Sequence, residues 1–355
     1  MSKISKLMES LKDNTHAGII TSEPNRLYFL DFHSSAGTLI VTKEQAYFII
    51  DFRYVEMARK QITDAQIILQ NDLDKQIKEI ISKHNIKEVS VENTYMTING
   101  YEEIKKQCAP ANVTLDADFD KAILRMRSIK DAEEIRRIRA AQELTDQTFA
   151  YILPRITKGR TERDIALDME FFIRKNGSEG VAFDFIVLSG KNGSTPHGVP
   201  GDTKVKNGDF ITMDFGAVVD GYRSDMTRTV AVGEVSDAMK YAYDTVLKAQ
   251  LESIKAIMPG KSCRDIDKIS RDIIYGAGFE GKYGHGLGHS VGVEIHEDPS
   301  FSPKSDSITE AGLIMTIEPG VYIEGEFGLR IEDMGLVTDS GIDIFTKSAK
   351  ELIIL

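Results

Sequence analysis

The segment DFITMDFGAVVDGYRSDMTRTV, residues 209–230, carries an Asp-Gly pair at 220–221 between two runs of β-forming residues. An Asp-Gly pair in this setting is typical of a two-residue turn that joins two antiparallel strands. The turn sets the strand pairing, and it places Asp214 opposite Thr227 and Asp225 opposite Gly216. The segment therefore predicts a β-hairpin that carries one aspartate on each strand.

Side chains alternate between the two faces of a strand, so the faces of this hairpin differ. One face is polar and carries Thr212, Asp214, Asp225 and Thr227. The other is apolar, must turn toward the core, and carries Met213, Phe215, Met226 and Val230. The two aspartates are diagonal neighbours roughly 5–8 Å apart, and like charges this close repel unless a cation lies between them. On this hairpin alone, a metal site and a pair of acids facing solvent are equally good interpretations.

A second segment, TIEPGVYIEGEFGLRIED at 316–333, repeats the arrangement around a turn centred on Gly325. In that register Glu318 lies opposite Glu332 on the same face. Two hairpins with facing carboxylates favour the metal interpretation. Four carboxylates that face one another need about four positive charges, which two divalent ions supply.

The chain has only seven histidines, and four of them stand in glycine- and proline-rich segments: His197, His285, His289 and His296. Three lie within YGHGLGHSVGVEIHEDP at 283–299, where the glycines allow the backbone to approach a site closely. Beside the paired acids, these histidines are candidate metal ligands and substrate contacts.

Three other motifs fail on their spacing. The glycines at 284, 286 and 288 lack the last glycine and the helix of a nucleotide-binding loop. His296-Glu297 starts like a HExxH zinc site, but Ser300 replaces the second histidine and Pro299 breaks the required helix. The pair Gly193-Ser194 is not part of the Gly-x-Ser-x-Gly pattern of serine hydrolases.

The bulk properties describe an ordinary globular protein. A length of 355 residues suggests about two domains, and a net charge of −11 argues against a nucleic-acid partner. Cys108 and Cys263 are far apart in the sequence and lack the spacing of metal ligands, so we expect two reduced thiols. Residues 1–14 form an amphipathic helix and no signal peptide, and no segment is apolar enough to span a membrane. We therefore expect a soluble cytoplasmic protein with no membrane partner.

The first 120 residues alternate strands with helices, which indicates an α/β domain. Strands are expected at 17–21, 37–42, 46–51, 66–70 and 87–92, and helices at 53–60, 72–84 and 100–107. Beyond a boundary near residue 125, helices are expected at 131–153, 161–175, 236–257 and 264–276. The predicted domains are 1–124 and 125–355.

From about residue 130 onward, the sequence resembles the metallopeptidases of the pita-bread fold, which include methionine aminopeptidases, aminopeptidase P and prolidase. The motifs that carry the resemblance stand in the order of that family: SGKNGSTPH (189–197), MDFG (213–216), SDMTRT (224–229), GHGLGHSVG (284–292), IHEDP (295–299), TIEPG (316–320) and LRIED (329–333). The N-terminal part resembles, more weakly, the creatinase-like domain of aminopeptidase P and prolidase. The resemblance implies an α/β creatinase-like domain followed by an α+β pita-bread catalytic domain.

The resemblance also implies a set of metal ligands and reacting groups. Two divalent ions per subunit would be held by Asp214, Asp225, His289, Glu318 and Glu332. Manganese suits this oxygen-rich set, and Co²⁺, Fe²⁺ or Zn²⁺ also fit. The ions would activate a water molecule as the nucleophile, and Glu318 would carry its proton to the leaving nitrogen. His296 and His197 would hydrogen-bond the reacting carbonyl, and Thr227 would support a ligand. His285 and Arg330, which would lie beside the site, would bind the substrate.

Substrate choice follows from the branch of the family. A histidine four residues before the metal histidine, as His285 is here, resembles the proline-specific branch. We therefore expect cleavage between an N-terminal residue and proline, in the manner of aminopeptidase P. The alternative is a prolidase restricted to dipeptides, but Ser300 stands where some prolidases have an arginine for the dipeptide carboxylate. Relatives imply a homodimer.

Two further alternatives remain open. One is a pita-bread scaffold that binds a partner protein and has lost catalysis, although such scaffolds usually lose metal ligands. The other is creatinase-like chemistry, which needs no metal pair. The intact set of five ligands argues against both.

Overall fold

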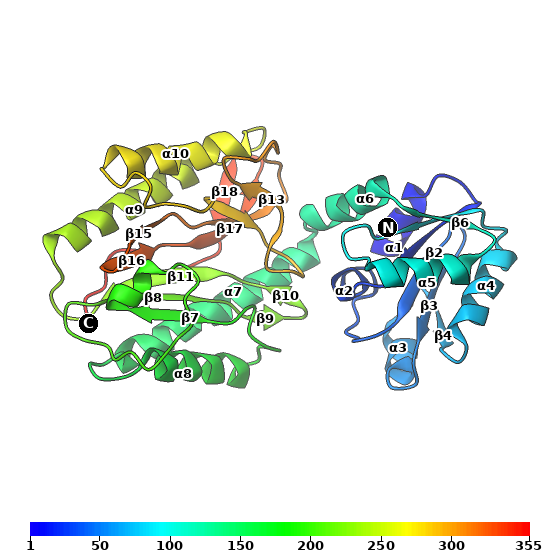
Figure 1. Cartoon of the computed structure of the whole chain (residues 1–355), viewed down its shortest axis with the longest axis horizontal. Helices are drawn as coiled ribbons and strands as arrows, with labels where there is room; N and C mark the ends of the chain where they lie inside the picture. The colour runs from blue at the N-terminus through cyan, green and yellow to red at the C-terminus, as the bar shows by residue number, and fades with distance from the viewer. The chain divides into compact units, whose positions relative to one another are not determined.

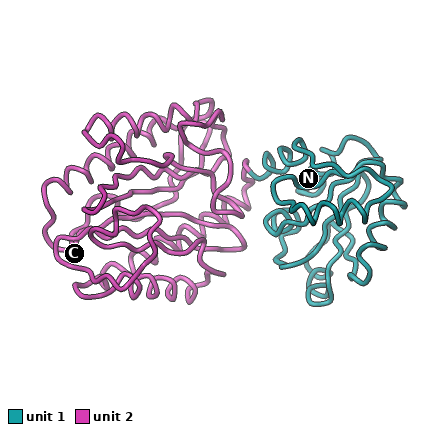
Figure 2. The backbone as a smooth tube through the Cα atoms, in the orientation of Figure 1, with its two compact units in different colours: residues 1–127 teal, residues 128–355 magenta.

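The computed structural model describes all 355 residues and divides into two compact units, 1–127 and 128–355 (Figure 2). No helix combines the length and apolar composition that crossing a lipid bilayer requires.

The first unit is built on a six-stranded mixed sheet in the order β4-β3-β2-β1-β5-β6. Its strands are β1 (His16–Ile20), β2 (Thr38–Val41), β3 (Ala46–Ile50), β4 (Gln66–Leu69), β5 (Glu88–Val91) and β6 (Asn112–Leu115). Its helices are α1 (Lys3–Ser10), α2 (Glu23–Leu30), α3 (Val55–Gln61), α4 (Leu73–Lys83), α5 (Ile98–Cys108) and α6 (Ala117–Ser128). The central strands are buried on both faces, which explains their unbroken apolar sequences.

Helices cover both faces of this sheet. Apolar residues of α4 and α5, such as Ile77 and Ile104, share one core with Ile19 and Val89 of the sheet. All five predicted strands of this unit are present, and so are the three predicted helices. The sequence interpretation missed α2, α6 and β6; α2 is short and β6 is a four-residue edge strand, whereas α6 is a 12-residue helix at the expected domain boundary.

The second unit places its strands between two helix pairs (Figure 1). One pair is α7 (Ala132–Ile152) and α8 (Glu162–Lys175), and the other is α9 (Asp237–Ala256) and α10 (Cys263–Gly276). Capping boxes begin α7 at Asp131 and α8 at Thr161. All four helices were predicted to within one or two residues.

Three sheets form the middle of this unit. The first, in the order β11-β8-β7, contains β7 (Ile186–Ser189), β8 (Phe210–Phe215) and β11 (Met226–Ala231). The second, in the order β13-β12-β14-β17-β18, contains β12 (Gly288–Ser290), β13 (Glu297–Phe301), β14 (Ile314–Ile317), β17 (Asp333–Thr338) and β18 (Gly341–Ile344). The third is the ribbon of β15 (Gly320–Ile323) and β16 (Phe327–Arg330). Short strands β9 (Val218–Val219) and β10 (Tyr222–Arg223) extend the first hairpin.

Both predicted hairpins have the expected register. Thr227 pairs with Asp214, and Asp220 and Gly221 have φ values of 47° and 78°, as a type I′ turn requires. In the second hairpin, Gly320 pairs with Arg330 and Ile317 with Asp333. The ladder is interrupted between these two pairs, where Glu318 and Glu332 stand.

Of the two interpretations of the first hairpin, the structure excludes a pair of acids that face solvent. The apolar face lies in the core, as predicted, with Met213 and Met226 fully buried. The polar face, however, is covered as well, because Thr212 Oγ1 donates to the Gly328 carbonyl at 3.3 Å and Thr229 Oγ1 donates to the Arg330 carbonyl at 3.0 Å. The β15–β16 ribbon therefore lies on this face, and the two aspartates do not face open solvent.

Candidate metal centre

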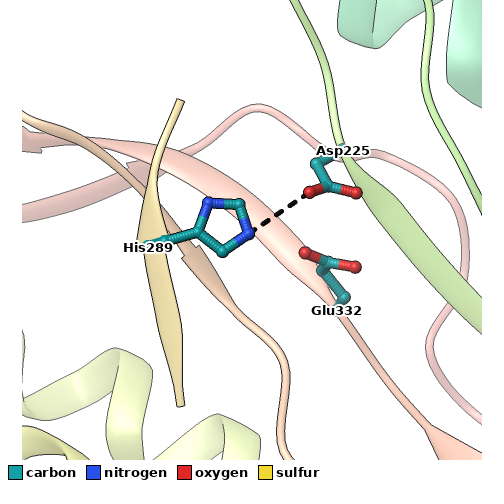
Figure 3. Close-up of side chains that lie close together, drawn as sticks. All are labelled: Asp225, His289 and Glu332. Carbon is teal, nitrogen blue, oxygen red and sulfur yellow. Dashed lines mark ion pairs between the residues drawn. The ribbon is translucent and has the colours of Figure 1, made fainter. Parts of the chain in front are cut away.

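Residues in or next to five strands bring the predicted ligands together. Asp214 is on β8, Asp225 immediately precedes β11, and His289 is on β12. Glu318 follows β14 and Glu332 precedes β17, at the interruption of the second hairpin. Ligand atoms of Asp225, His289 and Glu332 all lie within 4.8 Å of one another (Figure 3). Glu318 Oε1 is 3.4 Å from His289 Nε2, so it belongs to the same cluster.

The orientation of His289 shows that lone pairs, and no N–H hydrogen of its ring, face the carboxylates of the cluster. Its Nδ1 lies 3.0 Å from the Ser290 carbonyl, which can only accept, so Nδ1 carries the hydrogen. Burial lowers the pKa of His289, so the ring is neutral and Nε2 has a lone pair. That nitrogen faces Asp225 Oδ2 at 3.5 Å and Glu318 Oε1 at 3.4 Å. Acceptors facing acceptors in this way leave a place for a cation.

The carboxylates support the same conclusion. Asp214 Oδ1, Asp225 Oδ1 and Glu332 Oε1 are buried and have no hydrogen-bond partner. Burial, reinforced by the neighbouring carboxylates, raises the pKa of Asp225 and of Glu332 well above the ordinary range. Buried oxygens without partners are costly and call for an explanation. A donor set of four carboxylates and one neutral imidazole fits divalent metal ions.

Arg330 connects the carboxylates to the surrounding strands. Its Nη2 donates to Asp214 Oδ2 at 2.5 Å, and its Nε donates to Thr227 Oγ1 at 2.9 Å. Thr227 in turn donates to Glu332 Oε2 at 2.7 Å, which fits its expected role beside a ligand. A single buried guanidinium thus restrains one carboxylate directly and a second through the threonine hydroxyl.

His285 is held by a directed chain of hydrogen bonds. Its Nδ1 donates to the Gly286 carbonyl at 2.8 Å, which leaves Nε2 to accept from the Tyr322 hydroxyl at 3.0 Å. The Tyr322 oxygen accepts from Arg330 Nη1 at 2.8 Å. Burial lowers the pKa of His285 to about 3, so the imidazole stays neutral in the working pH range.

All nine predicted site residues line one cavity of about 650 Å³: His197, Asp214, Asp225, His285, His289, His296, Glu318, Arg330 and Glu332. The rings of His289 and His296 meet edge to face with centroids 4.4 Å apart. The remainder of the lining includes apolar side chains, among them Phe185, Ile186, Val199 and Ile295. Ser300 also lines the cavity.

The sequence did not predict two polar residues of the site, Thr316 and Tyr322. Thr316 Oγ1 accepts from the His289 backbone N–H at 3.0 Å and donates to Glu318 Oε1 at 3.1 Å. Tyr322 holds His285 as described above. Both stand an even number of residues from Glu318 in the sequence, so the alternation that paired Glu318 with Glu332 also contained this signal.

The pKa of Glu318 gives a testable pH dependence. Burial raises it to about 7 from the ordinary value of 4.5. A folded-state pKa above the unfolded value stabilises the fold at low pH, and this stabilisation disappears as the pH rises from 4.5 through 7. Over that window we expect the metal-free wild type to lose a few kcal/mol of stability, roughly, relative to Glu318→Gln. Urea denaturation with a chelator at about pH 5 and about pH 8 measures this; a pH-independent difference would contradict it.

Comparison with known proteins matches both units to described families. Residues 136–339 match metallopeptidase family M24, and residues 1–129 match the creatinase/prolidase N-terminal domain. An Xaa-Pro dipeptidase of Pyrococcus horikoshii is 33% identical over 99% of this chain and 98% of its own.

Solved structures give the same result. An Xaa-Pro dipeptidase from Bacillus anthracis superimposes with a TM-score of 0.94 at 38% identity, over 99% of both chains. An X-Pro aminopeptidase from Thermotoga maritima has a TM-score of 0.91 at 32% identity, over 96% of this chain and 98% of its own.

The resemblance and the fold class expected from the sequence are confirmed. The family implies a dinuclear metal site, for which Asp225, His289 and Glu332 are a possible ligand group. The chain belongs to metallopeptidase family M24 and carries a creatinase/prolidase N-terminal domain ahead of its catalytic domain.

Proposed function

We propose that the chain is an Xaa-Pro aminopeptidase that uses two divalent metal ions. The observation that carries the proposal is the cluster of four carboxylates and one neutral imidazole, with three buried oxygens that lack partners. The proposed ligands are Asp214, Asp225, His289, Glu318 and Glu332. Bound there, two divalent ions would lower the pKa of water toward neutrality and polarise a carbonyl. Manganese is our first choice, with cobalt or zinc as alternatives.

The remaining groups fit the steps of amide hydrolysis. Glu318 lines the cavity beside the other carboxylates, where it would accept a proton from water and release it to the proline nitrogen. His296 and His197, in the wall of the same cavity, would donate hydrogen bonds to the reacting carbonyl oxygen. His285, fixed by Tyr322, would contact the substrate next to the proline.

Proline specificity fits the apolar lining. A bond to proline has no N–H, so its recognition depends on the shape of the ring. Side chains such as Phe185, Val199 and Ile295 offer an apolar surface for such a ring. The names of the relatives from Pyrococcus horikoshii, Bacillus anthracis and Thermotoga maritima, all of them Xaa-Pro enzymes, support this substrate class.

The cavity favours peptides longer than two residues. Arg330 is the only lysine or arginine in the lining, and its guanidinium is already bonded to Asp214, Thr227 and Tyr322. These bonds favour a role for Arg330 in holding the site over direct substrate binding. A dipeptide would bring a free carboxylate next to its proline without an unengaged cation to pair it. The alternative, an Xaa-Pro dipeptidase, is favoured by the names of two of the relatives.

A panel of peptides tests the proposal. After chelation and addition of Mn²⁺, we expect Xaa-Pro-Xaa peptides to be cleaved at least about 10-fold faster than Xaa-Pro dipeptides, since about 1.4 kcal/mol from an unpaired carboxylate suffices for that ratio. Met-Ala-Xaa serves as the matched peptide without proline and should remain intact. Exclusive cleavage of dipeptides would establish the dipeptidase alternative. Efficient cleavage of Met-Ala-Xaa would overturn the Xaa-Pro assignment.

A further inference from the structure

Lys130 is a wholly buried cation at the base of the loop that separates the two site histidines His289 and His296. The exposed fraction of its side chain is 0%, and that of Glu297, its ion-pair partner, is 4%. Lys130 Nζ donates to Glu297 Oε2 at 3.1 Å and to Ser290 Oγ at 3.1 Å. The two acceptors directly follow His296 and His289 in the sequence. A single ammonium group thus ties together the two segments that carry these rings.

The backbone around this contact is irregular. Ser290 pairs with Glu297 across β12 and β13, and the register shifts between His289 and Ser290. An irregularity of this kind changes the direction in which a side chain points, and it occurs often beside active sites. The Ser290 carbonyl also accepts the Nδ1 hydrogen of His289. The position of Ser290 therefore determines how the His289 ring is held.

The Glu297 carboxylate closes the loop that ends at His296. Its Oε1 accepts from the Glu294 backbone N–H at 3.2 Å. A Cβ at Gly292 would come within 2.5 Å of Glu297 Oε2, so the carboxylate fills the inside of the loop. Lys130 compensates the charge of this carboxylate. Removal of the ammonium would take one donor away from the buried carboxylate in the turn that places His296.

Lys130 itself stands on a fixed backbone. Its N–H donates to the Gly312 carbonyl at 2.9 Å, and the next residue, Asp131, caps α7 through a capping box with Glu134. The side chain therefore extends from the start of a 21-residue helix toward the histidine loop. This arrangement gives the loop an anchor outside the two strands, β12 and β13, that flank it.

We infer that Lys130 is a positioning residue, which holds the His289 and His296 rings in the geometry of the metal centre through Ser290 and Glu297. The inference rests on the proposed function in one respect, that His289 is a metal ligand. Removal of the ammonium leaves the five ligands in place but loosens the segment that orients one of them. Loss of such outer contacts lowers metal affinity by about 10- to 100-fold.

The test compares Co²⁺ binding by wild type, Lys130→Met and Ser290→Ala. Methionine keeps the length of the lysine stem, and alanine at 290 removes one acceptor while leaving the Lys130–Glu297 pair intact. We expect Co²⁺ affinity to fall about 10- to 100-fold in Lys130→Met, with a changed visible absorption spectrum of the bound Co²⁺, and to fall by a smaller factor in Ser290→Ala. In Mn²⁺-loaded enzyme, kcat of Lys130→Met should fall with little change in KM, because the His296 contact is made in the transition state.

Two controls separate positioning from stability. Ile173→Ala removes a fully buried side chain of α8 that does not line the cavity, and it should destabilise the fold without altering Co²⁺ affinity or spectrum. Lys130→Met/Glu297→Gln removes both charges and should regain stability while Co²⁺ affinity stays low. Wild-type affinity and spectrum in Lys130→Met, or in the double variant, would overturn the inference. Failure of wild type to bind Co²⁺ would instead overturn the proposed function.

Discussion

Asp225→Asn is expected to reduce turnover at least about 1,000-fold while making the metal-free protein more stable. Asparagine has the same shape but contributes no negative charge to a metal pair, and several kcal/mol of transition-state stabilisation depend on those ions. In the metal-free protein the same change removes a buried carboxylate whose pKa is raised by burial and by Glu332 and Asp214. One of its oxygens has no partner at all. The expected gain near or above neutral pH is about 1–3 kcal/mol.

Three measurements check this prediction. Elemental analysis should find fewer than two metal ions per chain, peptide turnover should be lost, and urea denaturation with a chelator should show the gain in stability. Asp343→Asn is the matched control, because Asp343 lies in the same unit but is half exposed and pairs with Arg139 at the surface. It should change neither metal content nor turnover. Two metal ions and wild-type turnover in Asp225→Asn would show that the carboxylate cluster is not the metal site.

The opposite signs of the two effects have one cause. A cluster of buried acceptors is costly for the fold until a cation occupies it, so the features that destabilise the metal-free chain are those that bind metal. Both effects depend on the paired hairpins, because only their register brings carboxylates from separate strands into contact.

The register was also the feature that the sequence predicted best. The Asp220-Gly221 turn has one favourable geometry, and side-chain alternation then fixed the neighbours of Asp214 and Asp225. The same reasoning around Gly325 placed Glu318 opposite Glu332. Local chemistry therefore specified each half of the site. It did not show that β15 and β16 lie over the polar face of the first hairpin, because that contact joins different sheets.

Long-range contacts account for what remained unpredicted. Lys130 and Ser290 are 160 residues apart, and no spacing rule connects a lysine before a helix cap to the last residue of a short strand. Thr316 and Tyr322 are different, because they follow the same sequence alternation as Glu318. Their pattern was visible, but a threonine and a tyrosine on an apolar strand also fit an ordinary core. Only the contacts with His289 and His285 distinguish the two cases.

Arg228→Leu is expected to cause the largest loss of stability among single changes outside the metal cluster. The exposed fractions of the Arg228 and Asp333 side chains are 1% and 0%, and Arg228 Nη2 donates to Asp333 Oδ1 at 2.7 Å. Arg228 also donates to the backbone carbonyls of Ser348 and Ala349, at 2.8 and 2.9 Å, and to that of Glu332. It therefore ties β11, the strand after Glu332 and the C-terminal segment together.

Leucine at this position would leave Asp333 Oδ1 without its guanidinium partner and several carbonyls without donors. Breaking a buried ion pair by removal of one member costs about 3–5 kcal/mol, and here only Lys350 Nζ remains to pair with Asp333. The midpoint of urea denaturation of the metal-loaded protein measures the loss.

Arg163→Leu is the control, because Arg163 and Asp202 pair at 2.6 Å with exposed side-chain fractions of 55% and 81%. Exposed pairs contribute about 0–1 kcal/mol. Equal losses in the two variants would mean that burial does not determine the strength of the Arg228 network, and the account of how Glu332 is held would then be wrong.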